Sequence, residues 1–279
     1  MNDLAGDITE IERIARKVMG GTRIISISGL TSAASKAFIL SRIQAGTGKT
    51  FVVVADSNQE LESFESDLNF WKDLPAGELA ENRSVFSLPS FETDIYSGVS
   101  PHAATEERRA LALWQLTRSQ PDFLIVTAKS LIGRLVLPGE IEKFGAVLKR
   151  DEDFSPDELI GRLIAAGYVR EDPLDNVGQF SMRGGIVDVW SPDAAKPVRI
   201  EFFGDTVESI REFDPDTQLS TGQLKAIAIA PMREFAGSPQ DMKDWAFFAR
   251  ERFCDERFSR NLKDRTDFAD EGETFSGWE

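Results

Sequence analysis

Two stretches of this chain combine glycine with lysine, the residue types that a phosphate-binding loop uses to hold a nucleotide. The first, Gly46-Thr-Gly-Lys-Thr50, matches the end of the motif in which backbone N–H groups and a lysine bind phosphates. A working loop follows a strand and opens a helix, but this stretch leads into the apolar run Phe51–Ala55, and Ile43 stands where the motif needs glycine. We therefore interpret Gly46 and Gly48 as the turn between a helix and a strand.

The second stretch, Gly29-Leu-Thr-Ser-Ala-Ala-Ser-Lys-Ala37, follows the β-rich run Arg23–Ser28 and stands where a phosphate loop belongs. Its second glycine is a serine, its magnesium-binding hydroxyl is an alanine, and the spacing from Gly29 to Lys36 is one residue too long. We interpret it as a degenerate phosphate loop and expect no cofactor. The alternative is a nucleotide hydrolase that uses Lys36 or Lys49.

A second kind of chemistry, the docking of another protein, is indicated by two arginines and a phenylalanine. The runs 178–190 and 198–213 alternate in period two, with a Gly-Asp turn inside the second run, and this pattern predicts an antiparallel sheet. Counting by twos places Arg183, Arg199 and Phe203 opposite the apolar core face. Arginine and exposed aromatic residues are typical of interface hot spots. A solvated face of arginine–glutamate pairs is the alternative.

The remaining reactive residue types predict structural roles. His102 is the single histidine and Cys254 the single cysteine, so neither a histidine-based metal cluster nor an internal disulfide can form. His102 stands just before the helical pattern of Ala103–Arg118, which favours a structural or capping role. The aromatic helical pattern of Trp245–Cys254 is typical of core. Asp and Glu residues show no metal-loop spacing, and we expect no metal site.

The elements that must position these residues indicate two domains. Residues 1–145 alternate buried strands with helices, which predicts a parallel α/β sheet. The expected strands are Arg23–Ser28, Phe51–Ala55 and Phe123–Thr127, and the expected helices are Ala33–Gln44, Asn58–Leu74 and Ala103–Arg118.

From residue 146 the pattern changes to a strand, a helix around Leu159 and Leu163, and the antiparallel runs, which predicts a small α+β domain over 146–230. Residues 231–279 contain a helical, aromatic-rich stretch at 241–258 and a polar remainder, and we expect this last segment to stop inside a domain.

Composition limits the classes of partner. The net charge of −15, from 47 acidic and 32 basic residues, disfavours binding to a phosphate backbone by the whole surface. No apolar run approaches the ~20 residues that a membrane helix needs, and the N-terminus lacks a secretion signal. We expect a soluble, cytoplasmic protein with no membrane partner.

Several strings, in the same order, resemble the N-terminal part of the bacterial transcription-repair coupling factor family, Mfd. The resemblance covers nearly the whole chain, and the Ser-Pro-His string distinguishes it from the related excision protein UvrB. The strings are Ser87–Tyr96, Ser100-Pro-His102, Ala166-Gly-Tyr168, Gln179–Asp188, Arg199–Phe203 and Phe213–Gln218.

The resemblance implies a UvrB-like module: a helicase-like parallel-sheet domain with a degenerate phosphate loop, interrupted by a small α+β domain. In the family the inserted domain recruits UvrA, the damage-recognition ATPase, and the matching positions here are Arg183, Arg199 and Phe203. The resemblance also implies that residues 231–279 return to the first domain. It places the contacts with RNA polymerase and DNA, and the ATP-dependent translocase motor, beyond Glu279, so this chain would be non-catalytic. The stretch Gly46–Thr50 departs from the family pattern.

A DNA-binding module like UvrB is a further alternative. We find no counterpart in this sequence of UvrB's aromatic strand-separating hairpin, and the net charge of −15 is unfavourable for DNA.

Overall fold

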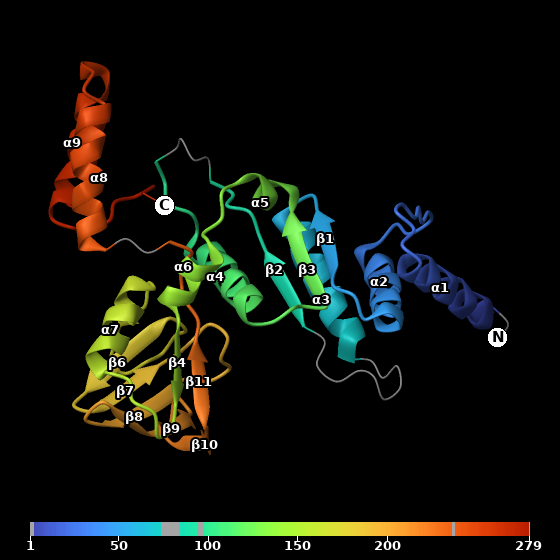
Figure 1. Cartoon of the computed structure of the whole chain (residues 1–279), viewed down its shortest axis with the longest axis horizontal. Coiled ribbons are helices and arrows are strands. Elements are labelled where there is room, and N and C mark those ends of the chain that lie inside the picture. Colours follow the sequence, from blue (N-terminus) through green and yellow to red (C-terminus); the bar gives the residue numbers. More distant parts are fainter. Residues whose placement is uncertain (1–2, 74–83, 94–97, 236–237, 279) are drawn as a thin grey trace. The chain divides into compact units, whose positions relative to one another are not determined.

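The computed structural model of the chain describes residues 3–73, 84–93, 98–235 and 238–278. Two compact units are present, one made of residues 1–90 with 115–134 and the other of 91–114 with 135–279 (Figure 1).

The first unit contains a three-stranded parallel sheet with the order β1 (Phe51–Ala55), β3 (Phe123–Thr127), β2 (Val85–Leu88). The predicted parallel α/β arrangement is therefore confirmed, and β2 is a strand that we did not anticipate. Helices α2 (Ala33–Thr47) and α3 (Asn58–Asp73) pack with this sheet; Leu74, the expected last residue of α3, lies outside the described residues. The shared core consists of Ala37, Val53, Ala55, Leu61, Phe64, Leu68, Phe123 and Ile125.

The predicted strand Arg23–Ser28 is wrong. This segment is coil between α1 (Asp3–Met19) and α2, and its residues Ile24 and Ile27 are exposed. A strand needs the ladder of hydrogen bonds to a neighbouring strand, and β-rich composition does not provide that neighbour. In the described structure β1 pairs only with β3.

The second unit contains the predicted antiparallel sheet in six strands, in the order β10-β9-β8-β7-β6-β5. Every pair is antiparallel except β5 with β6, which is parallel. The strands are β5 (Val169–Arg170), β6 (Gln179–Arg183), β7 (Ile186–Val189), β8 (Val198–Phe203), β9 (Thr206–Phe213) and β10 (Ser220–Gln223).

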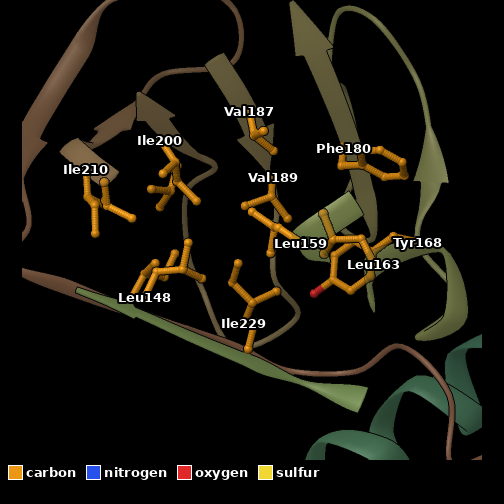
Figure 2. Close-up of a cluster of buried hydrophobic side chains, with 14 of the residues drawn as sticks. Leu148, Leu159, Leu163, Tyr168, Phe180, Val187, Val189, Ile200, Ile210 and Ile229 are labelled. Carbon is orange, nitrogen blue, oxygen red and sulfur yellow. The ribbon is translucent and has the colours of Figure 1, made fainter. Parts of the chain in front are cut away.

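One face of this sheet packs on helix α7 (Pro156–Ala165) and on the two-stranded sheet of β4 (Ala146–Lys149) and β11 (Ala226–Ile229). The side chains of Figure 2 point into this core from all three elements. Its fully buried members include Leu159, Leu163, Phe180, Val187, Val189, Ile200 and Ile210. The buried hydroxyl of Tyr168 donates a hydrogen bond of 2.6 Å to the carbonyl of Ala230, which ties the end of β11 to this core.

Helix α4 (Ala103–Arg118) is confirmed, and a buried ion pair connects it to the chain that follows β11. The Arg109 Nε donates to the Glu234 Oε2 at 2.8 Å, and both side chains are almost fully buried. Between α4 and β4 the chain forms two short helices, α5 (Ala128–Ile132) and α6 (Pro138–Phe144).

The expected helix over 241–258 is shorter and is followed by a second helix. Helix α8 (Pro239–Arg252) ends where Phe253 leaves helical dihedral angles, a short 3₁₀ turn follows, and α9 (Ser259–Asp270) packs on α8. Cys254 lies in the connection and is exposed, so its predicted place in a core is wrong. The aromatic spacing indicated a helix correctly, but two of its rings, Phe247 and Phe248, face solvent.

No helix in the part of the chain that the structure describes is long and apolar enough to cross a membrane.

Candidate functional site

The three residues that alternation placed outward lie on one face of the six-stranded sheet. Strand β6 carries Arg183 at its end, and β8 carries Arg199 and Phe203, while their neighbours Phe180 and Ile200 point into the core. Because paired residues of adjacent strands share a face, the register of β6, β7 and β8 puts all three on the side away from α7. We call this side the outer face.

Arg183 is exposed and holds a carboxylate at the edge of the outer face. Its Nε donates to the Asp172 Oδ2 at 2.7 Å, and a second guanidinium nitrogen bonds the other oxygen of the same carboxylate. The side chain keeps 59% of its surface accessible, so this ion pair lies in water. A solvated pair of this kind exchanges partners at low cost.

Arg199 has a different environment, because its guanidinium is enclosed by residues of its own domain. The Nε and one terminal nitrogen donate to both oxygens of Asp188, at 2.7 and 2.8 Å, and that terminal nitrogen also reaches the Gln218 Oε1 at 3.1 Å. The cation stands 4.7 Å from the centre of the Phe213 ring. Only 21% of the side chain is accessible. The hydrogen bond to Asp188 raises the pKa of Arg199, so its charge is permanent.

Phe203 is the most exposed aromatic residue on this face, with 81% of its surface accessible. It ends β8 immediately before Gly204, whose left-handed φ of 62° lets the chain turn into β9. Thr206 pairs with it on one side. On the side of β7, the antiparallel register that pairs Ile186 with Glu201 places Gly184 opposite Phe203, and Gly184 has no side chain. Nothing large enough to cover the ring is available across the strands.

The sequence did not lead us to predict which acidic residues pair with Arg183 and Arg199, and these are Asp172 and Asp188. Asp188 lies directly opposite Arg199 in the register of β7 and β8, so a full strand alignment would have found it. Asp172 lies in the loop after β5, and no periodicity predicts its contact with Arg183. The anticipated arginine–glutamate pairing does occur on this face, between Arg211 and Glu201.

The two glycine–lysine stretches do not combine into a site. Gly48 caps the C-terminal end of α2 with a φ of 62°, so Gly46–Thr50 stands at carbonyl groups and not at the amides that would bind phosphate. At the other end of α2, Ser32 accepts a hydrogen bond from the Ser35 amide, and the Lys36 Nζ stands 3.8 Å from a Glu60 oxygen.

His102 precedes α4 as predicted and caps it. Its carbonyl accepts hydrogen bonds from the amides of Thr105 and Glu106, and its Nδ1 accepts one from the Ala104 amide at 3.3 Å. Among the described residues, no group of three or more His, Cys, Asp or Glu side chains is arranged to hold a metal ion.

Comparison with known proteins connects this geometry to a family. The model of the UvrB interaction domain matches residues 147–235, which include β6 to β9 and thus the outer face. A transcription-repair-coupling factor from Myxococcus xanthus is 34% identical over 223 residues, which are 80% of this chain and 18% of the relative. The corresponding proteins of Bacillus subtilis and Escherichia coli are 32% and 27% identical over 77% and 74% of this chain. The chain thus spans about a fifth of the length of these relatives.

Proposed function

We propose that this chain is the N-terminal UvrB-homology module of a transcription-repair-coupling factor, the family of the relatives with which it aligns. In this proposal the inserted domain, residues 146–230, recruits the damage-recognition protein UvrA in transcription-coupled nucleotide excision repair. The outer face of its sheet is the docking surface, with Arg183, Arg199 and Phe203 as the functional residues.

The observation that carries this proposal is the uncovered phenyl ring of Phe203 within the segment that matches the UvrB interaction domain. A phenyl ring in water is unfavourable, since apolar surface gains about 25 cal/mol per Å² when it is buried. Partner binding would bury it, and the exposed guanidinium of Arg183 on the same face would supply hydrogen bonds to the partner.

The rest of the chain is assigned a supporting role. In this proposal residues 1–145 and 231–279 are the two parts of a helicase-like α/β domain with a degenerate phosphate loop at Gly29–Ala37, and the module is non-catalytic. These boundaries differ from the compact units of the structure, in which residues 91–114, 135–145 and 231–279 cluster with the second unit. The proposal places the ATP-driven motor and the contacts with RNA polymerase and DNA outside the aligned part, which is about a fifth of the length of the relatives. A cytoplasmic location follows, because bacterial transcription takes place there.

The test is a calorimetric titration of the chain with purified UvrA from the same organism. Arg183→Ala, Arg199→Ala and Phe203→Ala are titrated in parallel, each after its fold is verified by circular dichroism. Two matched controls are available within the same unit. Arg250 forms an exposed two-pronged ion pair with Asp270, like that of Arg183 with Asp172, and Phe268 is exposed on α9.

Saturable binding that the three substitutions weaken, with Arg250→Ala and Phe268→Ala unchanged, is the expected result. Absence of binding by the wild-type chain would contradict the proposed function. An equal loss of UvrA affinity in the two control variants would contradict the placement of the docking surface on the outer face.

A further inference from the structure

The outer face divides into an exposed corner and an internally bonded half. The corner lies at the turn that connects β6 to β7 and at the adjacent end of β8. It contains Arg183, Ile186 and Phe203. Ile186 lies directly between Arg183 on β6 and Glu201 on β8, and 37% of its surface is accessible.

Ile186 and Phe203 are diagonal neighbours on this corner. The residue that faces Phe203 is Gly184, which lies two positions before Ile186 in the turn between β6 and β7. Diagonal neighbours on adjacent strands are within reach of aromatic side chains, and glycine leaves the space between them open. Ile186 therefore extends the apolar surface of the Phe203 ring toward the guanidinium of Arg183.

The other half of the face is occupied by contacts within the domain. Arg199 donates to Asp188 and Gln218, and its guanidinium stands against the ring of Phe213. With both oxygens of Asp188 engaged and 79% of its own side chain covered, Arg199 has little surface to offer a partner. Its contacts join β7, β8 and the loop before β10.

We propose, on the basis of the proposed function, that UvrA contacts the corner of Arg183, Ile186 and Phe203, and that Arg199 is a positioning residue. Ile186 is thereby a new contact residue. The complementary surface of UvrA has an apolar depression for the phenyl ring and Ile186, and a carboxylate or carbonyl group beside it that accepts from Arg183. Arg199 acts through Asp188, which fixes the relative placement of β7 and β8 and hence of Ile186 and Phe203.

The contact role of Ile186 is tested by UvrA titration of Ile186→Ala against Val169→Ala. Val169 is an exposed aliphatic residue on the same face, because it pairs with Gln179 at the far end of β6. Truncation at a contact centre weakens binding about tenfold, whereas truncation outside the contact leaves it within about twofold. If the wild type binds and Ile186→Ala binds equally well, the inference is overturned while the proposed function stands. If the wild type does not bind UvrA, both the inference and the proposed function are contradicted.

The positioning role of Arg199 is tested by a double-mutant cycle with Asp188→Asn. Affinities are measured well below the unfolding temperature of every variant, so that a change in stability alone does not alter them. If Arg199 acts through Asp188, Arg199→Ala weakens UvrA binding in the wild-type background but has little further effect beside Asp188→Asn. Equal weakening in both backgrounds would make Arg199 a direct contact and overturn this part of the inference.

Discussion

The two faces of the six-stranded sheet are built from alternate residues of the same strands, yet they have opposite properties. On the inner face Phe180 and Ile200 are completely buried among aliphatic side chains. On the outer face Phe203 is open to solvent, and the arginines have defined hydrogen-bond partners. The inner face holds the domain together, and the outer face is ordered without being covered. Whether a phenylalanine of this sheet packs in the core or is exposed to solvent therefore depends on which of the two alternating sets of strand positions it occupies.

The same contrast holds between the outer face and the glycine–lysine stretches of the first unit. Gly46–Thr50 has the residue types of a nucleotide site but stands at the wrong end of α2. The outer face has no catalytic motif, but it has uncovered apolar surface beside fixed charges. The position of a motif in the fold therefore matters as much as its residue types.

The largest effect is expected from the inner face. Phe180→Ala removes a fully buried ring from the core, and it should lower the free energy of unfolding of the second unit by about 3–5 kcal/mol. Chemical denaturation followed by circular dichroism measures this loss. A loss below ~1 kcal/mol would mean that Phe180 does not stabilise this core.

Phe203→Ala should have the converse effect. Its UvrA affinity should fall by about 2–4 kcal/mol, which is roughly 30- to 1,000-fold, because a central aromatic contact is lost. Its unfolding midpoint should stay close to that of the wild type, since an exposed ring makes few contacts. Calorimetric titration and thermal unfolding measure the two quantities. An unchanged affinity would remove Phe203 from the docking surface.

Asp172→Asn refines the description of the exposed corner. Asp172 holds the guanidinium of Arg183, and an exposed ion pair contributes about 0.2–1 kcal/mol. Without this competitor the guanidinium is free for the partner, so UvrA affinity should rise by up to about fivefold. Arg250 offers the matched control, because Asp270→Asn frees its guanidinium and should leave UvrA affinity unchanged. Weaker binding by Asp172→Asn would indicate that UvrA contacts the carboxylate itself.

The smallest effects are expected from the lysines of the first unit. Lys36→Ala breaks one long surface contact with Glu60 and should change the free energy of unfolding by less than about 0.5 kcal/mol. Neither Lys36→Ala nor Lys49→Ala should alter UvrA affinity. Equilibrium titration with a labelled ATP analogue and magnesium provides the decisive check. Saturable micromolar binding that is lost in Lys49→Ala would restore the nucleotide-hydrolase alternative.

Local pattern predicted several elements that bury one face, although it missed the buried strand β2. The alternation over 198–213 was enough to place β8, the turn and β9, because a slip of one residue would have exposed Ile200 and Phe202. Helical spacing likewise found α3 through Leu61, Phe64 and Leu68. Pattern failed at Arg23–Ser28, where the residue types suit a strand but no neighbouring strand pairs with them in the described structure.

The sequence alone determined which residues of the sheet face outward, because side-chain direction in a strand has a period of two. It also carried the family resemblance, through the order of short strings. Tertiary structure alone decided how the outward residues differ. Arg183 bonds a carboxylate from a distant loop and stays exposed, whereas Arg199 is enclosed between Asp188 and Phe213. These contacts join segments up to 19 residues apart, and such distances between segments depend on packing, which no local periodicity records.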